Sequence, residues 1–259
     1  LTDKRRADVI RIAVDETAGR VPVVAGAIDM TTLRVNEHVR AAVDAGIDGI
    51  VITAPFYART HPEEIALHFR LVKEECGDVP LYAYDIPVAA NNVKLETSTV
   101  LKLAKEGVIQ GLKDSSGMDA GIRAVILGAQ QMGLNEFVVL TGSELTVDSA
   151  LMAGAHGVVP GIGNVDPAGY VKIFDLVAAG DYKAARAEQE RLFEMFNLIY
   201  VGSMARMSIG ASALGAFKAS LKHLGIIEDA RMAPPQIALN ADEIAAIIPF
   251  LKNAGLSVK

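Results

Sequence analysis

Short apolar runs rich in β-branched residues alternate with longer segments of helical periodicity along most of the chain. Six runs are candidate strands, at residues 21–28, 46–55, 79–87, 108–115, 137–143 and 157–163. Helical patterns lie between and after them, at residues 31–45, 62–75, 96–105, 119–132, 144–153 and 166–179. This alternation is typical of βα units around a parallel sheet, and the near-continuous apolar character of each run predicts strands covered on both faces.

The strand pattern stops at residue 181, and the remainder predicts three helices, at residues 181–201, 209–224 and 240–254. A further helix, at residues 3–17, opens the chain. A (β/α)8 barrel has eight strand–helix units in roughly 250 residues, whereas six units and a helical tail already use the 259 residues of this chain. We therefore predict an α/β fold, a (β/α)8 TIM barrel over residues 1–179 with a C-terminal helical region over residues 180–259. The first two βα units are expected to precede Leu1 and to be missing from this sequence.

An open, doubly wound sheet is the alternative fold. Its dinucleotide-binding members carry a glycine-rich GxGxxG turn after the first strand. The first visible run instead ends in Ala25-Gly26-Ala27-Ile28-Asp29, which lacks that pattern. The sequence therefore favours the barrel.

Charge, hydropathy and cysteine content exclude several classes of protein. With 25 Lys and Arg against 31 Asp and Glu, the net charge is −6, which disfavours a nucleic-acid partner because phosphates require a basic face. No apolar run approaches the roughly 20 residues of a membrane span. The single cysteine, Cys76, excludes an internal disulfide and a cysteine-rich zinc module, and we expect it to be structural. The sequence starts without Met and shows no signal-peptide pattern, so we expect a cytoplasmic protein.

Lys113 is the first candidate catalytic residue because it ends the fourth apolar run, and the active sites of parallel α/β folds lie at the carboxyl ends of strands. Apolar walls would lower the pKa of a lysine there and leave the neutral amine that attacks a carbonyl. Gly111, two residues earlier, shares its face and would leave room for a long side chain. The alternative is a strand-end lysine that reaches solvent.

Two tyrosines end neighbouring runs. Tyr84 lies in the third, and Tyr57 follows Thr53-Ala54-Pro55-Phe56 after the second. A phenol beside Lys113 could transfer protons during carbinolamine formation and carbon–carbon cleavage, although each tyrosine could equally be a core residue with a satisfied hydroxyl. Two tyrosines and a lysine at three strand ends indicate this chemistry more specifically than any one of these residues alone.

Other chemistries have less support. The five histidines include no HxH and no pair spaced i, i+4, so we predict no metal site. Ser143 lacks a histidine partner for a serine nucleophile. Asp114 is expected to cap the loop that follows it. Residues 161–164 could hold a phosphate or simply form a tight strand-to-helix turn.

The segments Tyr84-Asp85-Ile86-Pro87 and Gly111-Leu112-Lys113-Asp114-Ser115-Ser116-Gly117 resemble the dihydrodipicolinate synthase and N-acetylneuraminate lyase superfamily. Further segments resemble that family's strand ends in the same order, namely Ala25-Gly26, Thr53-Ala54-Pro55-Phe56-Tyr57, Thr141-Gly142-Ser143-Glu144 and Ala155-His156-Gly157-Val158-Val159. The resemblance implies a pyruvate-dependent class I aldolase or lyase on a (β/α)8 barrel, in a homotetramer, with no cofactor beyond the Schiff base between the substrate and Lys113.

The resemblance also implies site roles. Lys113 would form the Schiff base, Tyr84 would be the catalytic acid and base, and Tyr57 matches a tyrosine that completes a proton relay across a subunit interface. Val159 would lie along the pyruvyl group, chiefly through its backbone. The candidates for binding substrate hydroxyls are Thr141, Ser143, Glu144 and Asn91.

Two departures from the family pattern shape the functional prediction. The loop that holds the pyruvate carboxylate, Gly-Thr-Thr-Gly-Glu or Gly-Ser-Thr-Gly-Glu in the family, would precede Leu1 and is not in this sequence. Ala89 stands where the synthases carry an arginine for the carboxylate of their second substrate. Losing that bidentate guanidinium argues against aspartate semialdehyde as the acceptor and favours the sugar-acid aldolases.

The resulting prediction is a lyase that cleaves a 2-keto-3-deoxy sugar acid or a similar 2-oxo acid to pyruvate and an aldehyde. The alternatives are a 4-hydroxy-tetrahydrodipicolinate (dihydrodipicolinate) synthase and a sugar-acid dehydratase. A non-catalytic protein that binds an oxo acid and a purely structural role are the alternatives outside enzymes.

Overall fold

A computed structural model describes the whole chain, residues 1–259. The chain divides into two compact units. The first comprises Leu1–Gly142 and Ala153–Gly157, and the second comprises Ser143–Met152 and Val158–Lys259. The expected division into a barrel before residue 180 and a helical region after it stays a prediction.

The sheet consists of six strands in the order β1-β2-β3-β4-β5-β6, and the pairs from β1 to β5 are all parallel. The strands are β1 (Val24–Gly26), β2 (Gly49–Ile52), β3 (Leu81–Asp85), β4 (Gly111–Asp114), β5 (Val138–Thr141) and β6 (Gly157–Val158). Each strand lies beside its predecessor in the sequence, whereas a doubly wound sheet reverses direction at a switch point. The strand order therefore contradicts the doubly wound alternative and confirms an α/β fold with a parallel sheet.

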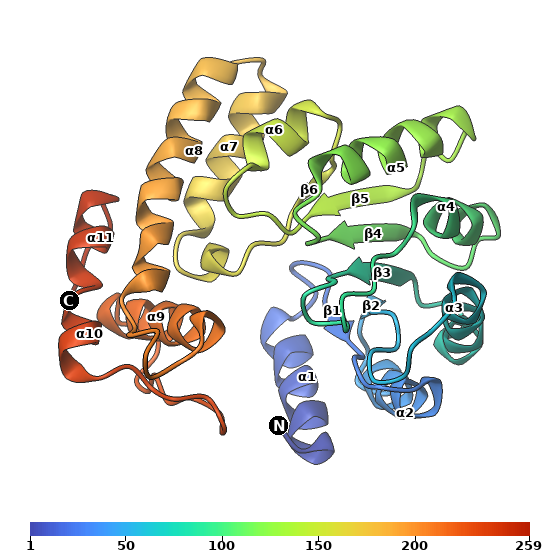
Figure 1. Cartoon of the computed structure of the whole chain (residues 1–259), viewed down its shortest axis with the longest axis horizontal. Coiled ribbons are helices and arrows are strands. Elements are labelled where there is room, and N and C mark those ends of the chain that lie inside the picture. Colours follow the sequence, from blue (N-terminus) through green and yellow to red (C-terminus); the bar gives the residue numbers. More distant parts are fainter. The chain divides into compact units, whose positions relative to one another are not determined.

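Helices alternate with the strands of the first unit, beginning with a helix that precedes β1. They are α1 (Asp3–Thr17), α2 (Thr32–Val43), α3 (Pro62–Cys76), α4 (Thr97–Lys105) and α5 (Asp119–Gln131). Each helix from α2 to α5 packs against the next, so these four form one layer along the sheet (Figure 1). Helix α3 shows how local chemistry sets a start: His61 and Glu64 form a capping box, and Pro62 occupies the first turn, where its missing N–H costs nothing.

Every strand is shorter than its predicted apolar run. The runs continue into the flanking loops, where Ile47 and Ala54 are buried without belonging to β2. The prediction that both faces are covered is also wrong for β3. Leu81, Ala83 and Asp85 are buried, while the alternate residues Tyr82 and Tyr84 are only partly buried. The sheet therefore has one closely covered face and one more open face in this unit.

The second unit is helical. Its elements are α6 (Val147–Met152), the 3-10 helix η1 (Ile162–Asn164), α7 (Pro167–Ala178), α8 (Tyr182–Phe196), the 3-10 helix η2 (Asn197–Tyr200), α9 (Ile209–His223), α10 (Ala241–Ala245) and α11 (Ile248–Asn253). The helix predicted over residues 181–201 tightens to a 3-10 helix at its end, as helix ends often do. The helix predicted over residues 240–254 is two short helices. Pro249 lies in the first turn of α11, because its ring and missing N–H favour a helix start over a helix interior.

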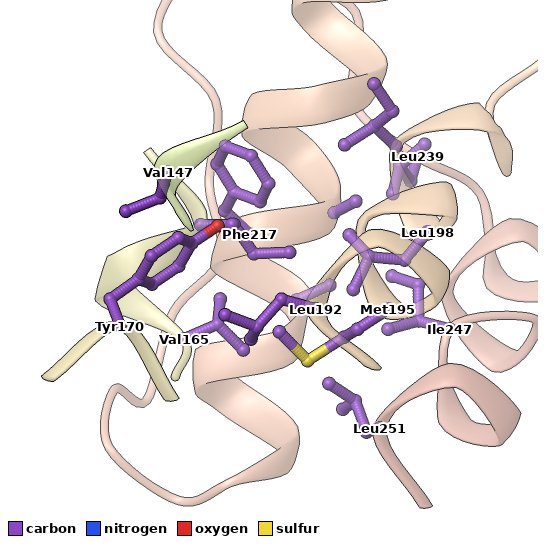
Figure 2. Close-up of a cluster of buried hydrophobic side chains, with 14 of the residues drawn as sticks. Val147, Val165, Tyr170, Leu192, Met195, Leu198, Phe217, Leu239, Ile247 and Leu251 are labelled. Carbon is purple, nitrogen blue, oxygen red and sulfur yellow. The ribbon is translucent and has the colours of Figure 1, made fainter. Parts of the chain in front are cut away.

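The core of the second unit is a single cluster of apolar side chains, to which α7 contributes Tyr170, α8 contributes Leu192 and Met195, α9 contributes Phe217 and α11 contributes Leu251 (Figure 2). Burying such side chains contributes about 1.5–3 kcal/mol each.

The helices of the second unit are also joined by hydrogen bonds and ion pairs of Arg191. The Arg191 guanidinium donates to Asp166 Oδ2 at 2.6 Å and to the carbonyl of Ala254 at 2.8 Å, and it pairs with Glu188. None of the helices is both long and apolar enough to cross a lipid bilayer.

Candidate functional site

Lys113 and Tyr84 form the centre of the candidate site. They are register partners on the parallel strands β4 and β3, so their side chains leave the sheet on the same face. The Lys113 Nζ atom lies 4.2 Å from the centre of the Tyr84 ring, within the range of a cation–π contact. Both side chains are partly buried. The two residues therefore lie together as expected, but the contact is with the ring of Tyr84, and the expected contact of its hydroxyl with Lys113 stays a prediction.

The space beside this pair is filled by Tyr82. A Cβ atom added to Gly111 would lie 2.9 Å from the Tyr82 ring, and one added to Gly49 would lie 3.0 Å from it. The ring therefore rests on two glycines from the strands on either side of β3. The expectation that Gly111 leaves room for Lys113 is wrong, because the aromatic ring of Tyr82 takes that space.

On its other side, the Lys113 side chain lies beside Gly142, directly after β5. A Cβ added to Gly142 would be 3.2 Å from Lys113 Cε and would overlap Ser115 Oγ. The Gly142 amide donates to the carbonyl of Asp114 at 2.7 Å, and the Ser115 amide donates to the carbonyl of Asp85 at 2.8 Å. These bonds continue the ladder past the strand ends. Lys113 thus has its Cε atom beside closely fitted backbone and its ammonium over the Tyr84 ring.

Asp85 and Asp114 each follow one residue of the pair, and their side chains lie on the opposite face of the sheet with no exposed surface. The Lys94 ammonium pairs with Asp85, and its Nζ atom lies 3.6 Å from Asp114 Oδ2. Burial raises the pKa of Asp85, and the bond from Lys94 opposes that rise. Asp114 Oδ1 accepts from the Ser116 amide at 2.7 Å, which confirms its predicted capping of the loop.

The sequence interpretation missed Lys94. It lies in the loop before α4, whereas the sequence prediction considered only residues at the carboxyl ends of strands. One signal was available: Lys94 is the only Lys or Arg between residues 74 and 101, a segment that contains the buried Asp85. An unpaired carboxylate at a buried strand end needs a cation, and this segment offers just one.

Three further predicted residues of the first unit lie away from the pair. Tyr57 is 82% exposed in the loop after β2. Asn91 is exposed in the turn after β3 with a φ of 53°, a left-handed conformation that asparagine tolerates. Thr141 is fully buried and is the register partner of Asp114, which places it on the face opposite Lys113. Their proposed roles stay predictions.

Two predicted residues of the second unit make local hydrogen bonds. Ser143 Oγ accepts from the amide of Leu145 at 3.3 Å and from that of Thr146 at 3.2 Å, a turn that leads into α6. Glu144 Oε1 accepts from the Ile162 amide at 3.0 Å. Both side chains thus stabilise the backbone conformation of loops in their own unit.

The remaining predicted residue, Val159, is exposed in the segment after β6. It lines an open groove of about 460 Å³ in the second unit. Val171 and Phe174 of α7 lie in the same groove. Its expected contact with a pyruvyl group stays a prediction.

The arrangement of Lys113 and Tyr84 suits reactions at a carbonyl carbon. A lysine amine can add to the carbonyl and expel water to form an imine, and a phenol in contact with it can supply and remove protons. No group of three His, Cys, Asp or Glu side chains could hold a metal ion. The predictions of no metal and no separate cofactor stay predictions.

A sequence model of the dihydrodipicolinate synthetase family matches residues 1–254. The 4-hydroxy-tetrahydrodipicolinate synthase of Methanothermobacter thermautotrophicus is 29% identical over 203 residues, which cover 78% of this chain and 71% of that relative. Across eight such synthases the match spans 64 to 78% of the relative's length.

Solved structures give the same answer for the fold. The dihydrodipicolinate synthase of Bacteroides thetaiotaomicron has a TM-score of 0.89 and 26% identity, covering 98% of this chain and 82% of that one. YagE, a prophage protein of the dihydrodipicolinic acid synthase family from E. coli K12 in complex with pyruvate, has a TM-score of 0.88 and 24% identity, covering 99% and 83% of the two chains. The fold is therefore that of dihydrodipicolinate synthases.

Proposed function

Because the chain belongs to the dihydrodipicolinate synthetase family, whose members are enzymes that form or break carbon–carbon bonds, we propose that Lys113 forms a Schiff base with pyruvate. This membership agrees with the lyase expected from the sequence. The observation that carries the proposal is the contact between Lys113 Nζ and the Tyr84 ring, at 4.2 Å from the ring centre. The pyruvate complex of the structurally similar YagE protein adds support.

In the proposed chemistry, the Lys113 amine adds to C2 of pyruvate, and the carbinolamine loses water to give an iminium. Loss of a proton from the methyl carbon C3 gives an enamine, which attacks the carbon of an aldehyde and forms the new carbon–carbon bond. Tyr84 protonates the leaving hydroxyl and later the aldehyde oxygen. Water then releases the product and restores the free amine.

The activity that the relatives favour is 4-hydroxy-tetrahydrodipicolinate synthase, with aspartate semialdehyde as the aldehyde. Eight curated relatives carry that name, at 29 to 32% identity to this chain. The support therefore moves from the sugar-acid lyase expected from the sequence to the synthase, which was its alternative.

A second candidate is cleavage of a 2-keto-3-deoxy sugar acid, the same chemistry in reverse. Ala89 favours it, because this exposed residue in the turn after β3 has no guanidinium to bind the carboxylate of aspartate semialdehyde. In this case Tyr84 would take the proton from the C4 hydroxyl of the substrate.

Several finer expectations belong to the same proposal. They are the (β/α)8 barrel with its boundary near residue 180, the homotetramer, the cytoplasmic location, and the absence of a separate cofactor. The sequential strand order supports the barrel. The exposure of Tyr57 supports its role at a subunit interface.

The test is reduction with borohydride in the presence of pyruvate, followed by intact-mass spectrometry and peptide mapping. We expect one reduced pyruvyl adduct on the peptide that contains Lys113, and none in Lys113→Ala. A folded protein that forms no adduct would contradict the Schiff-base proposal. Adding aspartate semialdehyde or 2-keto-3-deoxy sugar acids to the unreduced enzyme then identifies the second substrate, because only one class should turn over.

A further inference from the structure

We propose that Lys94 is a positioning residue, which holds the ends of β3 and β4 at the separation that the Tyr84–Lys113 pair requires. It acts from the opposite face of the sheet, through the buried carboxylates of Asp85 and Asp114. The inference rests on the proposed Schiff-base function, because its decisive measurement is the rate at which pyruvate is trapped on Lys113.

The register of the two strands provides the connection. Tyr84 pairs with Lys113, and the next residues, Asp85 and Asp114, pair with each other. Successive side chains point to opposite faces, so a force on the two carboxylates acts on the backbone one residue from each member of the reacting pair. A change of strand separation on the carboxylate side therefore changes the distance between Tyr84 and Lys113.

The two carboxylates need a cation between them. Neither has exposed side-chain surface, and like charges on neighbouring strands repel each other. Asp114 Oδ2 has no hydrogen-bond partner, so the Lys94 ammonium at 3.6 Å is its compensation on that side. Removing the ammonium leaves two buried negative charges. Their repulsion can be reduced only by protonation of a carboxylate or by separation of the strand ends.

Lys94 is itself fixed at this position. Its Nζ atom donates to the carbonyl of Leu95 at 3.2 Å, and the Leu95 amide donates to Asp85 Oδ1 at 3.1 Å. The ammonium and the adjacent backbone thus bind both oxygens of Asp85, while the same ammonium reaches Asp114. Its side chain is 29% exposed, so it is largely withdrawn from solvent. A surface lysine without a structural role would not be bound in this way.

The first experiment compares Lys94→Met with the native protein and with Lys102→Met. Lys102 is a matched control because it also forms an ion pair, with Glu63, but on the exposed side of α4. We expect the trapping rate at saturating pyruvate to fall about tenfold to a hundredfold in Lys94→Met, since a small displacement of reacting groups has effects of this size. Lys102→Met should trap pyruvate at the native rate.

Two further variants separate positioning from folding. Lys94→Arg keeps a positive charge between the two carboxylates and should therefore trap pyruvate faster than Lys94→Met does. The double variant Lys94→Met/Asp114→Asn removes the repulsion between the two carboxylates, so its stability should return toward the native value. No ammonium then bridges the two strand ends, so its trapping should stay slow. This combination of restored stability and slow trapping would not arise from a merely structural role.

The outcomes distinguish the two proposals. If the native protein forms no adduct, both the Schiff-base function and this inference are overturned. If the native protein is trapped and folded Lys94→Met is trapped equally fast, only the inference is overturned. If Lys94→Met does not fold, the double variant decides: trapping at the native rate overturns the inference, and slow trapping supports it.

Discussion

Lys113 and Tyr84 face each other across neighbouring strands, with the Lys113 Nζ atom 4.2 Å from the centre of the Tyr84 ring. The contact is made by the face of the ring, and the phenolic hydroxyl extends from its edge. The ring and the hydroxyl can therefore be tested separately: the ring holds the lysine, and the hydroxyl would move protons.

Tyr84→Phe keeps the ring and removes the hydroxyl. We expect turnover to fall by about 10²-fold to 10⁴-fold, the usual contribution of a general acid–base group, while the urea-unfolding midpoint changes little. Steady-state kinetics and unfolding curves measure the two effects. Tyr82→Phe on the same face is the matched control and should retain native turnover. A Tyr84→Phe variant with native turnover would rule out the assigned proton transfer.

Gly142→Ala tests how closely Lys113 is enclosed. The added methyl group would overlap Ser115 Oγ and would meet Lys113 Cε at 3.2 Å, so one side chain must move. We expect the free energy of unfolding to fall by about 1–3 kcal/mol, as for other overpacked sites. Urea denaturation measures this change.

The double variant Gly142→Ala/Ser115→Gly should recover part of that loss, because it removes the closest clash. Gly26→Ala in β1 is the matched control. Its methyl group would meet Ile28 and Val51 only at 3.8 and 3.9 Å, which is ordinary contact, and it should be tolerated. Equal stability of the Gly142 and Gly26 variants would show that the chain near Lys113 is loosely packed.

The proximity of Lys113 and Tyr84 could be predicted from the sequence because the positions of both residues follow from one rule of parallel sheets. Parallel strands end at the same edge, and the residues that end neighbouring strands become neighbours. The same rule does not specify the face. Thr141 also ends a strand, but its register with Asp114 turns it away from Lys113, and a one-residue difference in register decides this.

Lys94 could not be found in that way. Its partner Asp85 is nine residues away in sequence, yet the contact depends on how the loop folds back behind the sheet. The break between α10 and α11 is a different case. Pro249 was visible in the sequence, but the apolar spacing of Ile244, Ile247 and Leu251 continues through it and favoured one helix. All three side chains do pack in the core cluster, so the periodicity indicated burial correctly and helix length wrongly.

Ser143→Ala distinguishes a structural serine from a substrate-binding one. Its hydroxyl oxygen accepts from the amides of Leu145 and Thr146, and losing these bonds should lower the free energy of unfolding by about 1 kcal/mol. If Ser143 only supports this turn, the KM for the second substrate should not change. A rise in KM at native stability would instead assign the serine to substrate binding. Thermal unfolding and steady-state kinetics together decide between the two roles.

His68 is expected to make the protein sensitive to mild acid. It is 2% exposed on α3, its Nδ1 atom lies 2.9 Å from Thr32 Oγ1, and its Nε2 atom has no hydrogen-bond partner. Burial lowers the pKa of His68 to about 4, against about 6.5 in the unfolded chain. Between these values the unfolded chain binds a proton that the folded protein does not.

The stability contributed by neutral His68 is therefore fully present above about pH 6.5 and is lost as the pH falls toward 4. The pKa difference corresponds to about 3 kcal/mol over that window. His68→Asn cannot take up the proton, so the difference in unfolding free energy between native and variant proteins should shrink from pH 7 to pH 4.5. Carboxylates titrate in both proteins and cancel in this difference. Urea denaturation at the two pH values measures it, and a constant difference would show that protonation of His68 is not coupled to folding.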